Sequence, residues 1–516
     1  MESHPYTKPR GVGPVTTQLT PGAEPDLKPD LKNVAREIFR ETLAGIDIFE
    51  AMRSKVALKG SHLSITGIEP GASSIAVDLA AYNRVRVVAL GKASIEMARG
   101  LVSVLEPAVT VEGIVVAPKI AAATAANDND EIFAARDVTA LPRVPPARTG
   151  TRASGLRLIR AGHPEPDEES FRAAREILEL LHTSDAGTLV FFLLSGGGSS
   201  LVELPLDPAI TLAGMRQLNR VLVTCGASIA EINAIRKHLS AVKGGRLAAA
   251  ARAAMKLTLG VSDVPPGCES ALASGPTLPD PSTVYDACRV IERYALLPKL
   301  PAPIRTKFDP AKFDYPATIP ETPKEGDAIF ALSRFALLLG MDDLFSCAQR
   351  AAEGHGCIAV CDNTTDDWPV SQAADYLLGE LARIAAENPG HRVALIADGE
   401  LSSPVTGGGI GGRNSAFVLA CVEKIAETLK TPSLQKMLVR KIAVLSAGTD
   451  GQDGSSPAAG AVADDETLAR ARSRNLDPAE FALRSDSYSF FRALSDDIET
   501  GPTGNNLRDL RVLLAE

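Results

Sequence analysis

The sequence lacks the features that mark several whole classes of protein. No apolar run among its 516 residues reaches the roughly 18 residues of a transmembrane helix. Residues 1–10 contain no apolar core, so we expect no secretory signal. Lysine and arginine are spread along a chain of net charge −9, without the basic patch of a nucleic-acid-binding protein. These absences predict a cytoplasmic protein that binds neither membranes nor nucleic acids.

Transition-metal patterns are missing as well. The seven cysteines are scattered, and the one close pair, Cys357 and Cys361, has no second pair to complete a zinc set. The seven histidines show no H-x3-H spacing. We therefore expect reduced cysteines in packed interiors and no transition-metal enzyme.

The common nucleotide-binding motifs are absent too. There is no G-x4-G-K-[ST] phosphate loop and no protein-kinase motif set. No convincing G-x-G-x-x-G follows a strand, so a dinucleotide site is not expected.

What the sequence does contain is a strong strand-and-turn signal at residues 188–200. Residues 189–194 form an unbroken apolar run, typical of a strand buried on both faces. Glycines let a backbone turn sharply and let an anion approach it, and serines are good helix N-caps. An anion site is predicted here, the alternative being a tight turn without a ligand. The predicted phosphate- or substrate-binding residues are Ser195, Gly196, Gly197, Gly198, Ser199 and Ser200.

Other predicted strands also end in glycine turns and charged residues. Open α/β sheets place ligand and metal groups at the carboxyl ends of their strands. A second glycine-rich loop, residues 407–412, precedes a predicted helix. The charged and amide residues near these points are Lys92, Asp263, Glu400, Arg413, Asn414, Asp450 and Asp453.

Residues 226–254 read as helical, with Gly244 and Gly245 breaking or ending the helix, and this helix has a polar edge. The spacing places Asn233, Arg236, Ser240 and Lys243 along that edge. The edge either faces a binding cleft or is simply solvated.

Composition and periodicity divide the chain into two α/β domains. Residues 1–30 lack periodicity and are predicted to be a disordered tail, and residues 120–155 a surface insertion. We expect an N-terminal domain at 31–305, a proline-rich linker at 306–325 and a C-terminal domain at 326–516. Glycine turns, a lysine, an arginine and several acids are what phosphoryl transfer requires, so a phosphate-handling α/β enzyme is predicted.

The order of the motifs carries a resemblance to a known family. From about residue 33 the chain resembles the type II glycerate kinases, the glycerate 2-kinase family. The matching stretches are residues 91–94, 162–167, 194–200, 230–246, 273–277, 411–414, 446–454 and 500–506. The resemblance implies transfer of the γ-phosphoryl group of ATP to D-glycerate, giving 2-phosphoglycerate, with Mg²⁺. It also implies two α/β domains, each with a mostly parallel sheet flanked by helices, and an active site in the cleft between them.

The resemblance also implies roles for individual residues. Lys92 and Arg413 look like the family's essential lysine and arginine. Asp263, Glu400, Asp450 and Asp453 are the metal or base candidates, with Asp263 placed among the catalytic residues and the other three with the metal. Residues 195–200, with Arg236, Lys243 and Asn414, would hold phosphate or the substrate. A homodimer stays open.

Some positions depart from the family pattern, and two other functions stay open. Residues 266–269 read Pro-Gly-Cys-Glu where the family has a Gly-Asp, and residues 398–402 read Asp-Gly-Glu-Leu-Ser where it tends to Gly-Gly-Glu-Thr-Thr. The insertion at 120–155 is also longer than expected. A hydroxypyruvate reductase would need a dinucleotide site. A non-catalytic sugar-acid-binding protein would not need a lysine, an arginine and acids to converge on one cleft.

Overall fold

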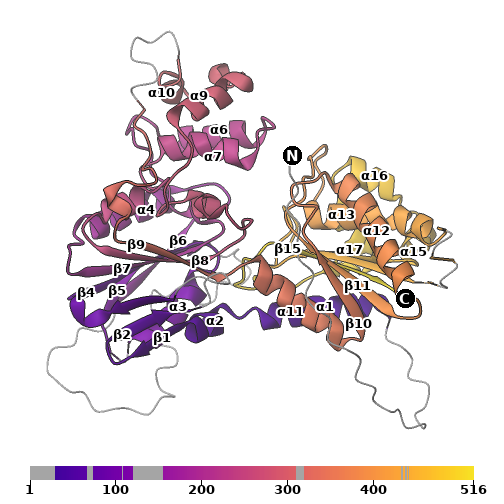
Figure 1. Cartoon of the computed structure of the whole chain (residues 1–516). Coiled ribbons are helices and arrows are strands. Elements are labelled where there is room, and N and C mark those ends of the chain that lie inside the picture. Colours follow the sequence, from indigo (N-terminus) through magenta and orange to yellow (C-terminus); the bar gives the residue numbers. More distant parts are fainter. Residues whose placement is uncertain are drawn as a thin grey trace.

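The protein folds into two α/β lobes that lie side by side in the computed structural model (Figure 1). The structure describes residues 30–66, 74–106, 108–119, 155–309, 319–431, 434–435, 439 and 441–516. Each lobe is built on a six-stranded sheet. The predicted tail and the predicted insertion lie almost wholly outside the described residues.

The first sheet is parallel throughout. Its spatial order is β6 (Gly155–Ala161), β5 (Val111–Pro118), β4 (Arg84–Leu90), β7 (Thr188–Ser195), β8 (Met255–Val261) and β9 (Ser333–Leu339). Side chains alternate between its faces, so Val87 and Ala89 pack in one apolar cluster and Val88 and Leu90 in another. Helices α2 (Ile48–Lys55) and α3 (Ser94–Leu105) join the first cluster, and α4 (Glu168–His182) and α8 (Arg246–Ala250) the second. Because the strands are parallel, the carboxyl ends of all six lie at one edge of the sheet.

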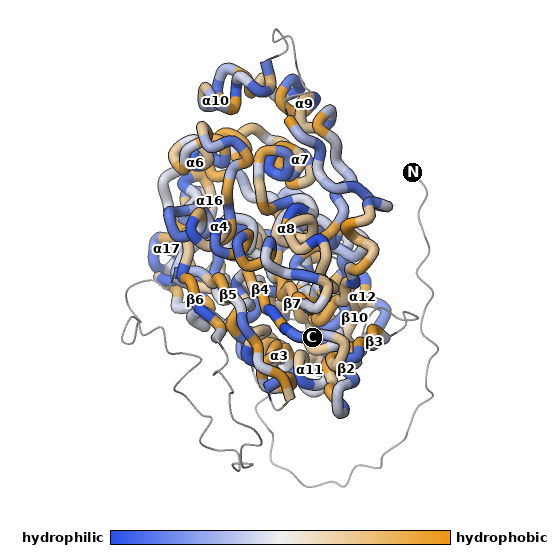
Figure 2. Tube along the Cα trace, turned by 90° about the vertical axis from the view of Figure 1, so that its left-hand side faces the viewer, coloured by the Kyte–Doolittle hydropathy of each residue, from blue (hydrophilic) through white to orange (hydrophobic). Residues whose placement is uncertain are grey.

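Two smaller units extend the first lobe. Strands β1 (Val56–Lys59), β2 (His62–Ile65) and β3 (Ile75–Asp78) form an antiparallel sheet. Helices α6 (Leu212–Val223), α7 (Ile229–Leu239), α9 (Val284–Arg293) and α10 (Ala302–Arg305) form an arm that projects from the lobe (Figure 1). Blue and orange alternate along α6 and α7 in Figure 2, because each buries one apolar face in the arm's own core.

The second sheet is mixed. Its order is β10 (Cys357–Asp362), β11 (Arg392–Asp398), β15 (Asp509–Ala515), β12 (Ile442–Gly448), β13 (Gly460–Asp464) and β14 (Asp497–Ile498). Helices α12 (Val370–Glu387) and α13 (Arg413–Thr428) pack on one face of this sheet. Helices α1 (Leu31–Gly45) and α11 (Met341–Gly354) pack on its other face, in an apolar cluster that spans both lobes. The short helices α15 (Thr467–Ser473), α16 (Pro478–Leu483) and α17 (Ser487–Leu494) precede β14.

The predicted two-domain α/β class is confirmed, but the second sheet differs from the expectation of mostly parallel strands. Only β10 and β11 pair in parallel there. The C-terminal strand β15 returns between β11 and β12 and runs antiparallel to both. This strand lies at the C-terminal end of the chain, where no strand was predicted.

The predicted linker at 306–325 does not separate the two sheets. Strand β9 follows it in sequence and still pairs with β8 of the first sheet. At the other end of the chain, α1 packs against β12, β13 and β15 of the second lobe. The chain therefore crosses between the lobes twice, after α1 and after β9. No helix in the described ranges is both long and apolar enough to cross a membrane.

Candidate active site

Two strand-end turns of the first lobe lie against each other. Gly91 and Lys92 follow β4, and Ser195 ends β7. The Lys92 amide donates to the Gly196 carbonyl at 2.9 Å, and the Ala93 amide donates to Ser195 Oγ at 3.0 Å. Gly91 has φ +125°, and a Cβ there would lie 2.1 Å from Ser195 Oγ, so a side chain is excluded. The buried Ser195 thus holds the backbone that presents Lys92.

The glycines after β7 leave room for groups from other loops. A Cβ on Gly196 would lie 1.8 Å from Asp263 Oδ2 and 1.9 Å from Asn506 Nδ2. Gly197 has φ +81°, and a Cβ there would lie 3.0 Å from His163 Nε2. The glycine turn is therefore packed against polar side chains of both lobes.

The two serines after these glycines are not N-caps, contrary to the prediction. Both lie inside the four-residue helix α5 (Gly198–Leu201), whose N-cap is Gly197 in the left-handed conformation. Ser199 Oγ lies 2.8 Å from Ser274 Oγ, and Ser200 Oγ donates to the Gly197 carbonyl at 3.2 Å. Their hydroxyls tie the turn to neighbouring backbone and to the loop after β8.

Charged and polar groups of the two lobes meet directly. Lys92 Nζ lies 2.6 Å from Asp450 Oδ2, in the loop that follows β12. Asn506 Nδ2, just before β15, donates to Asp263 Oδ2 at 3.1 Å. Burial raises the pKa of the Asp263 carboxyl, and the Asn506 bond and the charge of Lys92 oppose that rise. The predicted residues Lys92, Asp263 and Asp450 are thus brought together.

Arg413 opens α13 and binds two carboxylates. Its Nη2 and Nη1 lie 2.7 and 2.8 Å from the two oxygens of Glu400, and its Nε lies 2.5 Å from Asp509 Oδ2. Burial alone would lower the pKa of Arg413, but Asp509 and Glu400 raise it above its ordinary value. Desolvation by the surrounding protein, with the charges of Asp509 and Asp263, raises the pKa of Glu400. Glu400 and Asp509 therefore both bind the guanidinium of Arg413, and Asp263 lies close enough for its charge to affect the pKa of Glu400.

The carboxylate of Asp453 accepts hydrogen bonds from the start of α13. Its Oδ1 accepts from the Asn414 amide at 2.9 Å, and its Oδ2 accepts from the Ser415 amide at 2.9 Å and from Ser415 Oγ at 2.6 Å. Burial raises the pKa of Asp453 to about 6. Asn414 is held from its side chain as well, since Ser446 Oγ donates to its Oδ1 at 2.6 Å. Asp453 thus fixes the helix end that carries Arg413.

Arg236 and Lys243 are not brought to this place. Helix α7 ends at Leu239, before the break predicted at Gly244 and Gly245, so the polar edge does not continue to Lys243. Lys243 is fully buried and lies 2.5 Å from Glu203 Oε2, while Arg236 Nε donates to Asn219 at 3.0 Å inside the arm. Burial lowers the pKa of both cations. Neither lines the cavity described below, and neither do Asp263, Glu400 or residues 195–200, so a role of Arg236 and Lys243 in binding phosphate or substrate stays a prediction.

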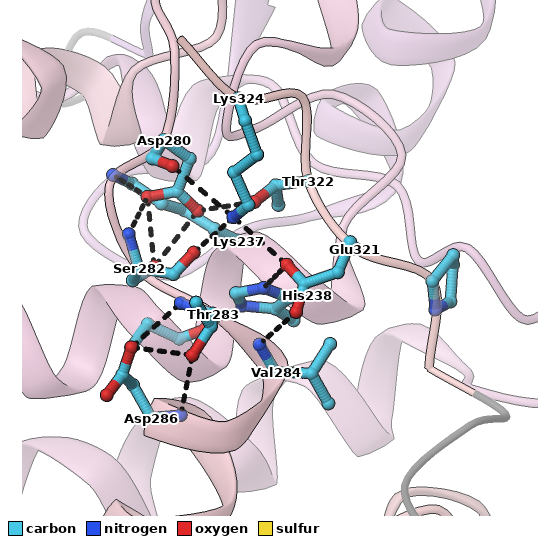
Figure 3. Close-up of polar contacts among 12 residues, drawn as sticks. Lys237, His238, Asp280, Ser282, Thr283, Val284, Asp286, Glu321, Thr322 and Lys324 are labelled. Carbon is cyan, nitrogen blue, oxygen red and sulfur yellow. Dashed lines mark hydrogen bonds and ion pairs between the residues drawn. The ribbon is translucent and has the colours of Figure 1, made fainter.

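The neighbouring polar residues of α7 are likewise used within the first lobe. Lys237 Nζ lies 3.0 Å from Asp280 Oδ1, and His238 Nε2 lies 3.2 Å from Glu321 Oε2. Figure 3 shows this network joining α7 to the start of α9 and to residues 321–324. It anchors the chain as it leaves the arm for β9.

A cavity of about 1210 Å³ lies next to these charged groups. The predicted site residues among its walls are Lys92, Arg413, Asn414, Asp450 and Asp453. Apolar side chains form other parts of the wall: Leu401, Val405, Leu419, Pro478 and Phe481. Ligand pockets in proteins typically combine apolar walls with a few polar groups, and this cavity has that combination.

The acids suit Mg²⁺ better as partners of a bound phosphate than as a protein-only cage. In the ranges that the structure describes, no three His, Cys, Asp or Glu side chains are grouped to hold a metal. Mg²⁺ in phosphoryl-transfer enzymes is often held by one or two carboxylates together with substrate phosphates. Asp450 lines the cavity and Glu400 adjoins Leu401 of its wall, and their oxygens are the hard donors that Mg²⁺ prefers.

Sequence reasoning missed three residues of this site. Asn506 and Asp509 come from the C-terminal turn and from β15, and His163 lines the cavity beside Lys92. The stretches 162–167 and 500–506 were both noted as motifs, but neither pattern indicated which side chain reaches the other lobe.

Comparison with known proteins gives matches along most of the chain. The model described as "Domain of unknown function (DUF4147)" matches residues 34–309, and the MOFRL family model matches residues 393–509. The D-glycerate 2-kinase of Thermotoga maritima is 34% identical over 355 residues, which are 68% of this chain and 78% of the relative. A protein of Agrobacterium vitis named a putative hydroxypyruvate reductase is 35% identical over 368 residues, 70% of this chain and 78% of that one.

A solved structure agrees with these matches. The crystal structure of glycerate kinase from Thermotoga maritima aligns with a TM-score of 0.67 and 29% identity, covering 94% of this chain and 99% of that one. The two domain models match the larger part of each lobe, and the alignment with the Thermotoga kinase covers 78% of that protein. The chain therefore belongs to the glycerate kinase family.

Proposed function

We propose that the protein transfers the γ-phosphoryl group of ATP to the 2-hydroxyl of D-glycerate, releasing ADP and 2-phosphoglycerate. The observation that carries this proposal is the convergence of Lys92 from one lobe and Arg413 from the other beside one cavity, each paired with carboxylates. Phosphoryl transfer depends mainly on positioning and on neutralising charge at the transferring group. The relatives that are glycerate kinases support glycerate as the acceptor.

The residues divide the chemistry among them. The cavity over the start of α13 would hold the nucleotide, with its base against the apolar wall near Phe481. On binding, the phosphates would replace a carboxylate as partner of Lys92 and of Arg413. Mg²⁺, held by Asp450 or Glu400 with phosphate oxygens, would offset the remaining negative charge.

Asp263 is the proposed acceptor of the hydroxyl proton. Its carboxylate has no cation within salt-bridge distance in the described residues, and burial raises its pKa. In the transfer, the substrate oxygen forms a bond to the γ-phosphorus, the bond from that phosphorus to the bridging oxygen of ADP breaks, and the proton moves to Asp263. A raised pKa makes the carboxylate a better proton acceptor near neutral pH.

One experiment separates this function from the reductase alternative, which the name of the Agrobacterium relative raises. Purified protein receives D-glycerate, ATP and Mg²⁺ in one tube, and hydroxypyruvate with NADH or NADPH in another. We expect ADP and 2-phosphoglycerate in the first, identified by phosphorus NMR, and no nicotinamide oxidation in the second. A 3-phosphate product would keep the kinase and change the position of attack, whereas NADH-dependent turnover would refute the proposal. Binding of glycerate without any turnover would instead support a sugar-acid-binding protein.

A further inference from the structure

The first lobe contributes three residues to the wall of the cavity, and one of them is a histidine with no assigned role. These residues are Lys92, His163 and Pro164, and the rest of the wall belongs to the second lobe. A first-lobe side chain in this position lies where groups of both lobes meet. Lys92, which contacts Asp450 of the second lobe, lies at this junction between the lobes.

The imidazole of His163 lies beside the glycine turn after β7. A Cβ added to Gly197 would lie 3.0 Å from His163 Nε2 and 3.3 Å from Lys92 Cγ. The ring and the lysine stem therefore border the same small volume. Within the part of the chain that the structure describes, no hydrogen bond is formed by either ring nitrogen. The ring thus keeps a donor and an acceptor available to a ligand.

The surroundings keep this ring uncharged at neutral pH. Burial and the positive charge of Lys92 together lower the pKa of His163 to about 4, against the opposing charge of Asp450. Above that pH one ring nitrogen carries a proton and the other does not. A neutral ring adds a hydrogen-bond donor without drawing Asp450 away from Lys92.

We propose that His163 is a catalytic residue, whose Nε2–H donates a hydrogen bond to an oxygen of the transferring phosphoryl group alongside Lys92. The inference rests on the proposed kinase function and deepens it. A donor aimed at the charge that develops in the transition state acts more strongly in a water-excluded site than in water. The role is hydrogen-bond donation, and the hydroxyl proton stays with Asp263.

The test uses side chains that keep or remove this donor in the full-length protein. His163→Leu should lower kcat by about 10²-fold, because one transition-state donor is typically worth that much. KM for ATP and for D-glycerate should change by less than about threefold, since the bond strengthens in the transition state. His163→Gln, whose amide nitrogen approximates the position of Nε2, should recover much of kcat, and His163→Asn should not. His62→Leu, at the exposed first residue of β2 and outside the cavity, is the matched control.

The possible outcomes are distinct. Full kcat in His163→Leu, or equal kcat in the glutamine and asparagine variants, would overturn the inference. A loss of kcat that is matched by weaker binding of ADP and by a lower melting temperature would assign His163 a structural role only. If the leucine variant does not fold, the comparison of glutamine with asparagine still decides. Wild-type protein that forms no phosphoglycerate would instead refute the proposed function, and with it this role.

Discussion

At the residue scale, Lys92 is the first side chain to test. Lys92→Met removes the first lobe's cation from the cavity and should lower kcat by about 10³, or roughly 4 kcal/mol of transition-state stabilisation. Steady-state kinetics with native circular dichroism would measure this. Lys59→Met, at the exposed end of β1, is the control and should keep wild-type turnover. Wild-type kcat in Lys92→Met would show that this lysine does not contact the phosphoryl group.

Two aspartates three positions apart should respond differently. Asp450 lines the cavity, and its side chain binds Lys92 and the Gln452 amide of its own loop, whereas Asp453 accepts three hydrogen bonds from the start of α13. Asp450→Asn should raise the Mg²⁺ concentration for half-maximal activity by about tenfold, or roughly 1.4 kcal/mol. Asp453→Asn should leave that concentration unchanged and lower the free energy of unfolding by about 1–2 kcal/mol, the usual effect of losing a helix cap. The reverse pattern would support the prediction made from the sequence that Asp453 is a metal ligand.

The buried Asp453 also predicts a pH dependence of stability. Its pKa is raised to about 6, above the ordinary value of about 4, so between these pH values the folded state binds more protons than the unfolded state. The contribution of this group to the free energy of unfolding is therefore complete below about pH 4 and is lost as the pH rises through 6. Urea unfolding of wild type and Asp453→Asn should show the difference between them shrinking by up to about 3 kcal/mol across that window. A difference that grows with pH would mean that the three hydrogen bonds outweigh burial.

At the scale of elements, the glycine-rich loop before α13 contains a matched pair. A Cβ on Gly412 would lie 2.2 Å from Asp453 Oδ1 and 2.4 Å from the Asp453 carbonyl carbon, whereas a Cβ on Gly408 meets nothing within 4 Å. Gly412→Ala should therefore displace the start of α13 and with it Arg413, lowering kcat by about 10² or more, since a misplacement of about 1 Å costs that much. Gly408→Ala should keep wild-type activity. Equal kinetics in the two variants would show that Asp453 can move without disturbing Arg413.

Elements that depend on the local sequence could be predicted, whereas positions that depend on contacts between distant segments could not. Apolar runs predicted strands at 84–90, 189–194 and 392–397, and the structure has strands at 84–90, 188–195 and 392–398. Lys92, Asp263 and Asp450, which follow β4, β8 and β12, lie close together. Lys243 could not be placed this way, because Gly244 and Gly245 adopt positive φ and the chain after α7 turns inward to Glu203, which lies far away in sequence. His163 was within a recognised motif, but its position beside Lys92 depends on how two loops pack.

At the scale of the whole molecule, the sequence indicated two α/β lobes but misplaced the segments between them. A proline-rich run resembles a linker, whereas residues 319–324 are held to α7 and α9 by the polar network around Asp280 and Glu321. Helix α1 shows an amphipathic pattern that says nothing about which sheet it covers, and it covers the second. Such pairings depend on tertiary contacts between distant segments, so local patterns do not reveal them.

The position of β9 predicts how the chain can be divided. A fragment of residues 47–340 contains every strand of the first sheet, while one of residues 47–325 ends before β9. Without β9, the edge of β8 is unpaired, and Ala336 and Leu338 no longer cover their part of the core. The longer fragment should unfold cooperatively in urea, and the shorter one should aggregate or unfold without a clear transition. Both omit α1, which belongs with the second lobe, so its absence affects them equally. Equal stability of the two fragments would show that β9 adds little to the sheet and would restore the boundary at residues 306–325.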